Sequence, residues 1–271
     1  MLGAIIGDVV GSVYEWNNLK SKNFDLFSNE CYFTDDSVMT IAIAKSLLDC
    51  NGDYNNLSEI TINNMVKFGR ENIHCGFGGS FIRWIQMDVH EPYNSYGNGS
   101  AMRVSPCGLI ANSIEEAKNL SYKVTCISHN HPEGLKGAEA VSVAIFLART
   151  GKSKEEIRKY IIDNYYNIDF TLDSIRDNYR FDVSCQGSVP QALEAFFESN
   201  SFEDTIRNAI SIGGDSDTIA AIAGSVAGPY YGIDKDIEDK VLCYLPDNFK
   251  EVISSFEKII NRNDKNYILT K

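Results

Sequence analysis

The stretch at residues 211–228, SIGGDSDTIAAIAGSVAG, constrains the fold more than any other part of the chain. Two carboxylates stand directly ahead of a run of small apolar residues, which is typical of a tightly packed, buried helix. Near the other end of the chain, Gly3, Gly7 and Gly11 recur every four residues on one face of a predicted helix. Because such a stripe lets a second backbone approach closely, we expect these two helices to pack together.

Helical periodicity runs through almost the whole chain, and strand-like alternation is scarce. We therefore predict an all-α fold, formed by a single domain over residues 1–271 because no linker rich in Pro, Gly or Ser interrupts it. The predicted helices span residues 2–16, 37–50, 57–70, 113–128, 134–150, 154–166, 189–198, 202–211 and 218–227, with a short helix from Ala101. Gly228 and Pro229 are predicted to end the last long helix.

The charge and the cysteine content indicate which binding partners and which cellular compartment to expect. The formal net charge is −12, which argues against non-specific nucleic-acid binding because that binding depends on Lys and Arg neutralising phosphates. The seven cysteines are scattered and form no CxxC pair, a pattern that favours a reducing, cytoplasmic compartment. We expect no signal peptide, no membrane span and, since no apolar heptad seam is visible, a monomer.

Two acidic motifs stand at predicted helix N-termini: FTDDS at residues 33–37 and GDSDT at residues 214–218. The ordinary interpretation is an N-cap, since Asp, Ser and Thr are favoured there and anions suit that helix end. Two carboxylates exceed what one cap uses, however, and the excess occurs twice. If the motifs converge, four carboxylates share a site that needs cations, and hard oxygen ligands suit Mg²⁺, Mn²⁺ or Ca²⁺.

A calcium loop of the EF-hand type does not fit the second motif, because Ala220 and Val226 stand where that loop requires Gly and Glu. A binuclear Mg²⁺ or Mn²⁺ site is therefore a more specific hypothesis than a calcium loop. A zinc site is disfavoured: His129 and His131 lie close together near Cys126, but no further ligand nearby completes the set.

The glycine-rich loop GNGSAM at residues 97–102 has two interpretations. It can be an ordinary turn, or it can present backbone N–H groups to a phosphate at a helix start. It is not a dinucleotide-binding fingerprint, since Met102 occupies the third glycine position, and no Gly-Lys-Ser/Thr follows to make a P-loop.

Five blocks in order give the chain a family resemblance: GAIIGDVVGSVYE (3–15), FTDDSVMT (33–40), YGNGSAMRVSP (96–106), HNHPEGLKGA (129–138) and GGDSDTIAAIAG (213–224). The chain resembles the ADP-ribosylglycohydrolases, the group that includes dinitrogenase reductase-activating glycohydrolase and the ADP-ribosyl-acceptor hydrolases. The resemblance implies a compact, orthogonal helical bundle with a binuclear metal site in a central cleft.

The resemblance also implies roles for particular residues. Metal ligands would be Thr34, Asp35, Asp36, Asp215, Asp217 and Thr218. The catalytic carboxylate would be Glu15, with a metal-site aspartate such as Asp36 as the alternative. ADP-ribose would lie against Gly97, Asn98, Gly99, Ser100, Ala101 and Met102, with His129 near its phosphates. Asp8 is either a neighbour of the metal site or a residue that holds the caps in place.

These expectations describe a metal-dependent ADP-ribosylhydrolase that uses two Mg²⁺ or Mn²⁺ ions and cleaves the bond from C1″ of the distal ribose to an acceptor. Two alternatives stay open: a non-catalytic ADP-ribose binder or crystallin-like structural protein, and a Mg²⁺-dependent phosphohydrolase that would release AMP. The acceptor is also open among arginine, serine, poly(ADP-ribose) and O-acetyl-ADP-ribose, although an acidic surface suits a cationic acceptor such as arginine.

Overall fold

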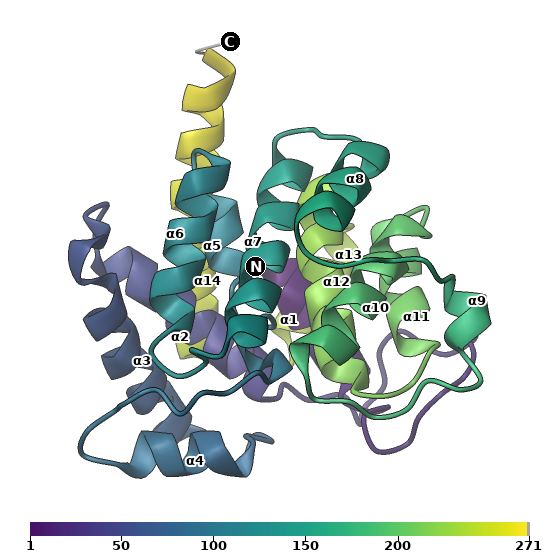
Figure 1. The fold of residues 1–271 in the computed structure, drawn as a ribbon, viewed down its shortest axis with the longest axis horizontal. Helices are drawn as coiled ribbons and strands as arrows, with labels where there is room; N and C mark the ends of the chain where they lie inside the picture. The colour runs from purple at the N-terminus through teal and green to yellow at the C-terminus, as the bar shows by residue number, and fades with distance from the viewer. Residues whose placement is uncertain (270–271) are drawn as a thin grey trace.

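The computed structural model describes the backbone of residues 1–269 and the side chains of residues 1–261. At its centre α1 (Leu2–Gly11) lies directly against α12 (Ser216–Tyr231), as the small-residue pattern predicts (Figure 1). A Cβ atom added to Gly7 would lie 2.1 Å from the carbonyl oxygen of Ala220, and one added to Gly3 would lie 2.2 Å from that of Gly224. The two backbones are therefore in contact, and only glycine fits at the crossing.

The described residues contain fourteen α-helices and no strand, which confirms the predicted all-α fold. Besides α1 and α12, the helices are α2 (Asp35–Asp49), α3 (Leu57–Glu71), α4 (Gly79–Gln86), α5 (Ser105–Ile110), α6 (Ile114–Thr125), α7 (Pro132–Arg149), α8 (Lys154–Asn164), α9 (Leu172–Ile175), α10 (Cys185–Phe197), α11 (Phe202–Ile210), α13 (Lys235–Leu242) and α14 (Asp247–Leu269). Two 3₁₀ turns, Tyr54–Asn56 and Asn98–Ser100, complete the described elements.

The other helices surround the central pair. In Figure 1, α2, α3 and α4 lie on one side and α9, α10 and α11 on the other, with α7 between them. Aliphatic and aromatic side chains from all these layers are buried in the core that surrounds α1 and α12. No helix in the described part of the chain is both long enough and apolar enough to cross a membrane.

The first helix ends earlier than predicted, at Gly11 rather than Trp16. A Cβ atom on Gly11 would lie only 2.5 Å from the Cα of Asp217, so the chain leaves the helix where it meets the start of α12. The Ser12 hydroxyl donates back to the Val9 carbonyl at 2.9 Å and closes the last turn. Glu15 therefore lies in the following turn and not on the same helical face as Asp8.

The helix α12 runs through Pro229 to Tyr231, so the prediction that Gly228 and Pro229 end it is wrong. A proline removes one N–H donor from a helix, and here that loss falls within the last turn. The helix ends instead at Gly232, whose φ of +77° is a conformation that glycine adopts easily.

Candidate active site

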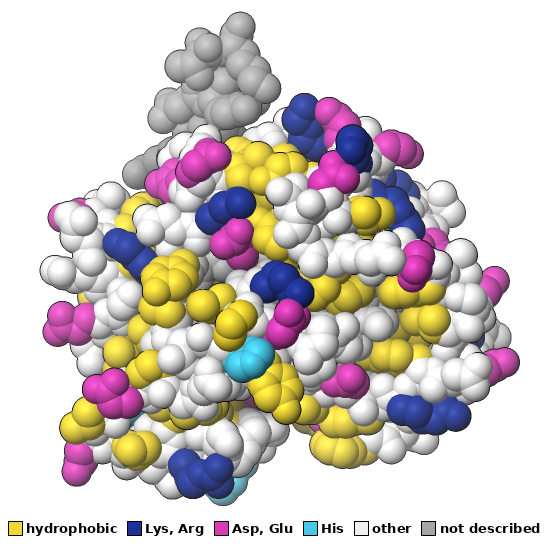
Figure 2. Space-filling view, viewed as in Figure 1, with side chains coloured by type: hydrophobic (Ala, Val, Ile, Leu, Met, Phe, Trp, Pro, Cys, Tyr) yellow, Lys and Arg dark blue, Asp and Glu magenta, His cyan; other side chains and the backbone are white. Residues whose placement is uncertain are grey.

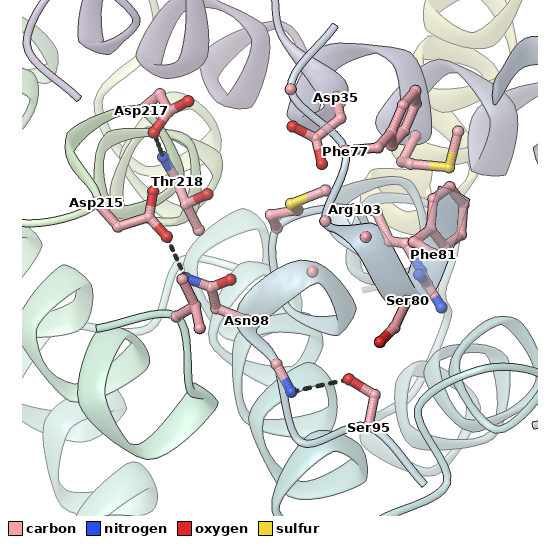
Figure 3. A pocket seen from close by; sticks show the side chains of 18 of the residues that line it. Asp35, Phe77, Ser80, Phe81, Ser95, Asn98, Arg103, Asp215, Asp217 and Thr218 are labelled. Carbon is pink, nitrogen blue, oxygen red and sulfur yellow. Dashed lines mark hydrogen bonds between the residues drawn. The ribbon is translucent and has the colours of Figure 1, made fainter. Parts of the chain in front are cut away.

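A cavity of about 410 Å³ opens where the N-termini of α2 and α12 meet the loop around residues 95–103 (Figure 3). Its wall includes most of the predicted site residues: Glu15, Asp35, Gly97, Asn98, Gly99, Met102, His129, Asp215, Asp217 and Thr218. Asp215 and Asp217 line one side, and Asp35 faces them from the other. The two acidic caps, which lie far apart in the sequence, therefore converge on one cavity.

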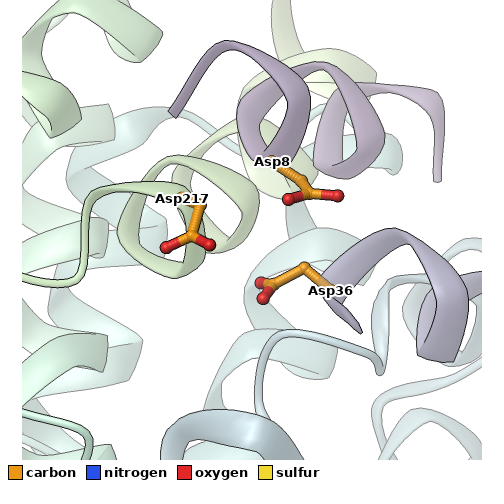
Figure 4. A group of neighbouring side chains, drawn as sticks. All are labelled: Asp8, Asp36 and Asp217. Atoms are coloured by element: carbon orange, nitrogen blue, oxygen red, sulfur yellow. The ribbon is translucent and has the colours of Figure 1, made fainter. Parts of the chain in front are cut away.

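The carboxylates form two overlapping groups. Asp8, Asp36 and Asp217 each offer an oxygen atom, and these three atoms lie within 4.8 Å of one another (Figure 4). Glu15, Asp215 and Asp217 form a second group that meets the same limit. The three carboxylates in Figure 4 come from α1, α2 and α12 and point toward one another.

Asp8 holds the start of α2 in place. Its carboxylate accepts hydrogen bonds from the backbone N–H of Thr34 at 3.0 Å, the Thr34 hydroxyl at 2.6 Å, the backbone N–H of Ser37 at 3.1 Å, and the Ser37 hydroxyl. These donors occupy both carboxylate oxygens, and all of them come from the first turn of α2 or its cap. The contacts therefore support the role of a cap partner for Asp8.

The other carboxylates of the two groups have little positive charge nearby to balance them. Burial, followed by the charge of Asp217, raises the pKa values of Asp35 and Asp36 well above their usual range. Burial also raises the pKa of Asp217 well above that range and that of Asp215 to about 6. Burial and the Asp217 charge together raise the pKa of Glu15 to about 7.

Within residues 1–261, no lysine or arginine forms an ion pair with this cluster. The Oδ1 atom of Asp36 is buried without a hydrogen-bond partner, while its Oδ2 accepts from the Thr218 hydroxyl at 3.1 Å. A buried carboxylate without a partner is costly, and divalent cations that prefer oxygen ligands would supply the missing charge. The donor set therefore fits a metal site.

Thr34 and Asp36 lie behind the cavity wall. The Thr34 hydroxyl donates to Asp8 and accepts the Asp36 N–H at 3.4 Å, which leaves one oxygen lone pair free. Both side chains are almost fully buried, and neither borders the cavity. Of the predicted metal ligands, Asp35, Asp215, Asp217 and Thr218 are thus the ones that face the cavity directly.

The loop at residues 97–102 is fixed mainly by its own hydrogen bonds. The backbone N–H of Asn98 donates to the Val183 carbonyl at 2.7 Å, and those of Ala101 and Met102 donate to the Asn98 carbonyl. The Ser100 hydroxyl donates to the Gly134 carbonyl, and neither Ser100 nor Ala101 borders the cavity. The loop therefore offers a phosphate fewer free amides than the glycine-rich pattern predicts.

The side chain of Asn98 joins this loop to the acidic cluster. Its Nδ2 atom donates to the Asp215 carboxylate at 2.7 Å and to the Ser188 hydroxyl at 3.0 Å. This contact fixes the loop against the N-terminus of α12. The resemblance implied a role for Asn98 at the ligand, and the structure adds a contact with a predicted metal ligand.

The two histidines of the HNH segment have different surroundings. His129 is buried at the cavity wall, with Nδ1 2.8 Å from the Ser128 hydroxyl oxygen, which also accepts from Arg103 at 2.8 Å. Burial, with a smaller contribution from the Arg103 charge, lowers the pKa of His129 well below its usual value. His131 instead caps α7 by accepting the Glu133 N–H at 3.1 Å, and it does not border the cavity.

Several cavity residues were not predicted from the sequence. Phe77 and Phe81 contribute aromatic surface to the wall, and Trp16 and Phe181 also border the cavity. None of these aromatic residues belongs to a polar motif. Trp16 directly follows Glu15, so its position next to the GAIIGDVVGSVYE block was the signal that could have found it.

Comparisons with known proteins point to one family. The model of the ADP-ribosylglycohydrolase family matches residues 1–267. The ADP-ribosylhydrolase ARH3 of Mus musculus is 24% identical over 335 residues, covering 95% of this chain and 87% of the relative. The ADP-ribosylarginine hydrolase Tri1 of Pseudomonas putida (strain GB-1) is 25% identical over 262 residues, covering 86% of this chain and 70% of the relative.

A solved structure described as an ADP-ribosylglycohydrolase-related protein complex superimposes with a TM-score of 0.68 at 21% identity, covering 96% of this chain and 97% of that one. It supports the fold. Because the family model matches nearly the whole chain, the protein belongs to the ADP-ribosylglycohydrolase family, as the five sequence blocks predicted, and is a hydrolase of ADP-ribose glycosidic bonds.

Proposed function

We propose that the protein is a metal-dependent ADP-ribosylhydrolase that cleaves the bond between C1″ of the distal ribose and an acceptor atom, releasing ADP-ribose. The observation that carries this proposal is the convergence of two acidic helix N-termini on one cavity without a basic ion-pair partner among residues 1–261. The names of the ARH3 and Tri1 relatives support an ADP-ribosylated substrate.

In this proposal two Mg²⁺ or Mn²⁺ ions are held by Asp35, Asp36, Asp215, Asp217 and Thr218, with the remaining lone pair of Thr34 as a further ligand. Ions of this kind would supply positive charge for the substrate hydroxyls and for charge that develops during the reaction. The unpartnered Oδ1 of Asp36 and the raised pKa values of the aspartates support such a site.

The cavity has the volume of a small-molecule site, since such sites typically occupy about 300 to 1,000 Å³. We place the distal ribose at the acidic cluster and the diphosphate toward His129. Arg103 can only donate to Ser128, so the Ser128 proton can go to Nδ1 of His129. This arrangement leaves Nε2 protonated, as a neutral donor that faces Gly97 and Gly99.

Glu15 is the carboxyl that we assign to proton transfer at the scissile bond. It borders the cavity beside Asp215 and Asp217, and burial raises the pKa of its carboxyl, so that it holds a proton more readily than an exposed glutamate does. The reaction would pass through an oxocarbenium-like transition state, as glycoside hydrolysis generally does. Asp36 is the weaker candidate, because it lies behind the wall.

The test is hydrolysis of matched arginine-linked, serine-linked and O-acetyl ADP-ribose substrates in Mg²⁺, Mn²⁺ or EDTA. We expect metal-dependent release of ADP-ribose, which the double variant Asp215→Ala/Asp217→Ala should lose. The matched control is Asp173→Ala/Asp247→Ala, which also removes two carboxylates but takes them from side chains that are 84% and 92% exposed.

The products separate the alternatives. Release of AMP would identify a phosphohydrolase instead. Tight binding of ADP-ribose with no turnover of any of the three substrates would identify a non-catalytic binder. Undiminished activity in EDTA, or in the Asp215→Ala/Asp217→Ala protein, would contradict the metal site.

A further inference from the structure

An exposed aromatic pair stands at the edge of the cavity. The rings of Trp16 and Phe181 stack with their centroids 5.2 Å apart and their planes 23° apart. Both rings border the cavity, yet Trp16 is 77% exposed and Phe181 is 42% exposed. An indole that is stacked on one side and still so exposed must present its other face to solvent, and aromatic surface of this kind often marks a binding site.

The pair is held firmly in place. Asn18 donates to the carbonyls of Tyr14, Glu15 and Gly214, which ties the turn that carries Trp16 to the start of α12. The segment that carries Phe181 is fixed on the other side, because the Val183 carbonyl accepts the Asn98 N–H. The open indole face is therefore already in place before a ligand binds.

The pair lies on the acceptor side of the proposed reaction. Trp16 follows Glu15 in the chain, and both residues border the cavity. If the distal ribose lies at Asp215 and Asp217, we expect the group attached to C1″ to follow a path past the neighbouring Glu15 and the aromatic pair. Whatever occupies that path is in contact with an indole face and a carboxyl group.

Charge favours a cation in that position. Of the carboxylates that border the cavity, Glu15 is the one that we do not assign to the metals, and the chain as a whole carries a formal charge of −12.

The basic side chains that lie close to Trp16 and Phe181 in the sequence are engaged with backbone carbonyls. Lys20 donates to the carbonyls of Tyr179 and Ile212, and Arg180 donates to those of Asp177 and Tyr179. Among the described residues, no lysine or arginine lies over the Trp16 ring.

We propose that Trp16, supported by Phe181, is the platform for a guanidinium acceptor, so that the enzyme prefers ADP-ribosylated arginine. The inference rests on the function proposed above. A guanidinium is planar and permanently charged, and it stacks on aromatic faces more readily than other side chains do. Serine and acetate acceptors carry neither the charge nor the plane and would gain little from the indole.

The experiment compares ligands that differ only in the acceptor. Calorimetric titration in EDTA measures the affinity of ADP-ribose, ADP-ribosylserine and ADP-ribosylarginine for the wild-type protein, and steady-state kinetics in Mg²⁺ measure kcat and KM. We expect the arginine-linked ligand to bind about 5- to 10-fold more tightly than the serine-linked one. Trp16→Ala should abolish that difference and leave the affinity for ADP-ribose within about twofold.

Two further variants separate stacking from other effects. Trp16→Phe keeps an aromatic face but loses the indole N–H, so we expect it to retain most of the arginine preference even if kcat falls for every substrate. Tyr122→Ala removes a ring that is 54% exposed on α6 and does not border the cavity, and it should behave like the wild type.

The possible outcomes test the guanidinium platform and the proposed ADP-ribosylhydrolase activity separately. If ADP-ribosylated substrates are hydrolysed but Trp16→Ala matches Tyr122→Ala, or if the wild type prefers the serine-linked ligand, only the guanidinium platform is wrong. If no ADP-ribosyl ligand binds and none is hydrolysed, the proposed function is wrong and the platform with it.

Discussion

Glu15 shows at the residue scale how surroundings can prepare a side chain for chemistry. It is half-buried beside Asp215 and Asp217, and burial together with the Asp217 charge raises its pKa to about 7. A positioned acid or base typically contributes about 10²- to 10⁴-fold to a rate. We therefore expect Glu15→Gln to lower kcat by about 100-fold or more, measured with the preferred substrate at saturating Mg²⁺.

The control for this prediction is Glu30→Gln, which removes an exposed carboxyl that does not border the cavity. Affinity for ADP-ribose should stay within about threefold in both variants, because the amide of Gln is close to Glu in size and shape. A Glu15→Gln protein that turns over at the wild-type rate would exclude Glu15 from proton transfer.

Asp8 leads to a prediction about stability. Its carboxylate accepts hydrogen bonds from the backbone and hydroxyl groups of Thr34 and Ser37. Asp8→Asn turns one acceptor oxygen into an NH₂ group that faces these donors. We expect the free energy of unfolding in urea to fall by about 2 to 4 kcal/mol. Asp49→Asn, at the exposed end of the same helix, should change it by less than about 1 kcal/mol and is the control.

The sequence predicted the polar half of the site and missed much of the apolar half. The aspartates of the two caps lie in short motifs whose charge is conspicuous, but their convergence was only a condition of the metal-site hypothesis until the family resemblance implied it. Trp16 and Phe181 come from segments far apart in the chain and meet only through tertiary packing. The position of Glu15 was predicted on a helix that in fact ends at Gly11, and tertiary contact with Asp217 ends that helix.

At the scale of whole elements, the contact between α1 and α12 positions the acidic residues. A Cβ atom on Gly7 would lie 2.1 Å from the Ala220 carbonyl oxygen and 2.6 Å from the Ala221 nitrogen, so Gly7→Ala has to push the helices apart. We expect the free energy of unfolding to fall by about 3 kcal/mol or more, as in other overpacked cores, measured by urea titration.

The matched control is Gly78→Ala. Gly78 has a φ of −60°, and nothing lies within 4 Å of a Cβ atom placed on it, so this substitution should be close to neutral for stability. Equal unfolding midpoints for the two alanine variants would mean that the small-residue stripe does not set the distance between α1 and α12.

The helices themselves were largely predictable, because periodicity reports which face is buried. Their ends were less so. The helix α12 continues through Pro229, since a proline in the last turn removes only one donor, and α5 begins at Ser105 after a 3₁₀ turn rather than at Ala101. Four helices, α4, α9, α13 and α14, were not predicted. Such boundaries depend on contacts with neighbouring helices, which local propensity does not contain.

At the scale of the whole molecule, the charged groups on the surface differ from the carboxylates inside the cavity. On the face shown in Figure 2, basic side chains lie singly among acidic ones and form no continuous stripe. Such a surface lacks the electrostatic footprint of a nucleic-acid-binding face. The buried carboxylates, by contrast, have no basic partner among residues 1–261, so the stability of the whole fold should respond to pH and to divalent metal.

The direction of that response follows from the raised pKa values. Burial raises the pKa of Glu15 from 4.5 to about 7 and that of Asp215 from 3.8 to about 6. Between about pH 4 and pH 7 the folded protein therefore keeps protons that the unfolded chain has released, and the free energy of unfolding falls as the pH rises. In EDTA we expect the Tm to decrease across this window.

Divalent metal should reverse that loss, because a cation stabilises the ionised carboxylates and binds the folded state alone. At about 100 times its Kd a ligand adds about 2.7 kcal/mol, and each kcal/mol raises the Tm of a chain of this size by about 2 to 4 °C. We expect Mg²⁺ to raise the Tm by about 5 °C or more at pH 8 and by clearly less at pH 5, measured by circular dichroism. Asp215→Ala/Asp217→Ala should flatten both the pH dependence and the Mg²⁺ response. An equal Mg²⁺ shift at pH 5 and pH 8, or a Tm in EDTA that rises between them, would show that the buried carboxylates are neutralised by something other than metal.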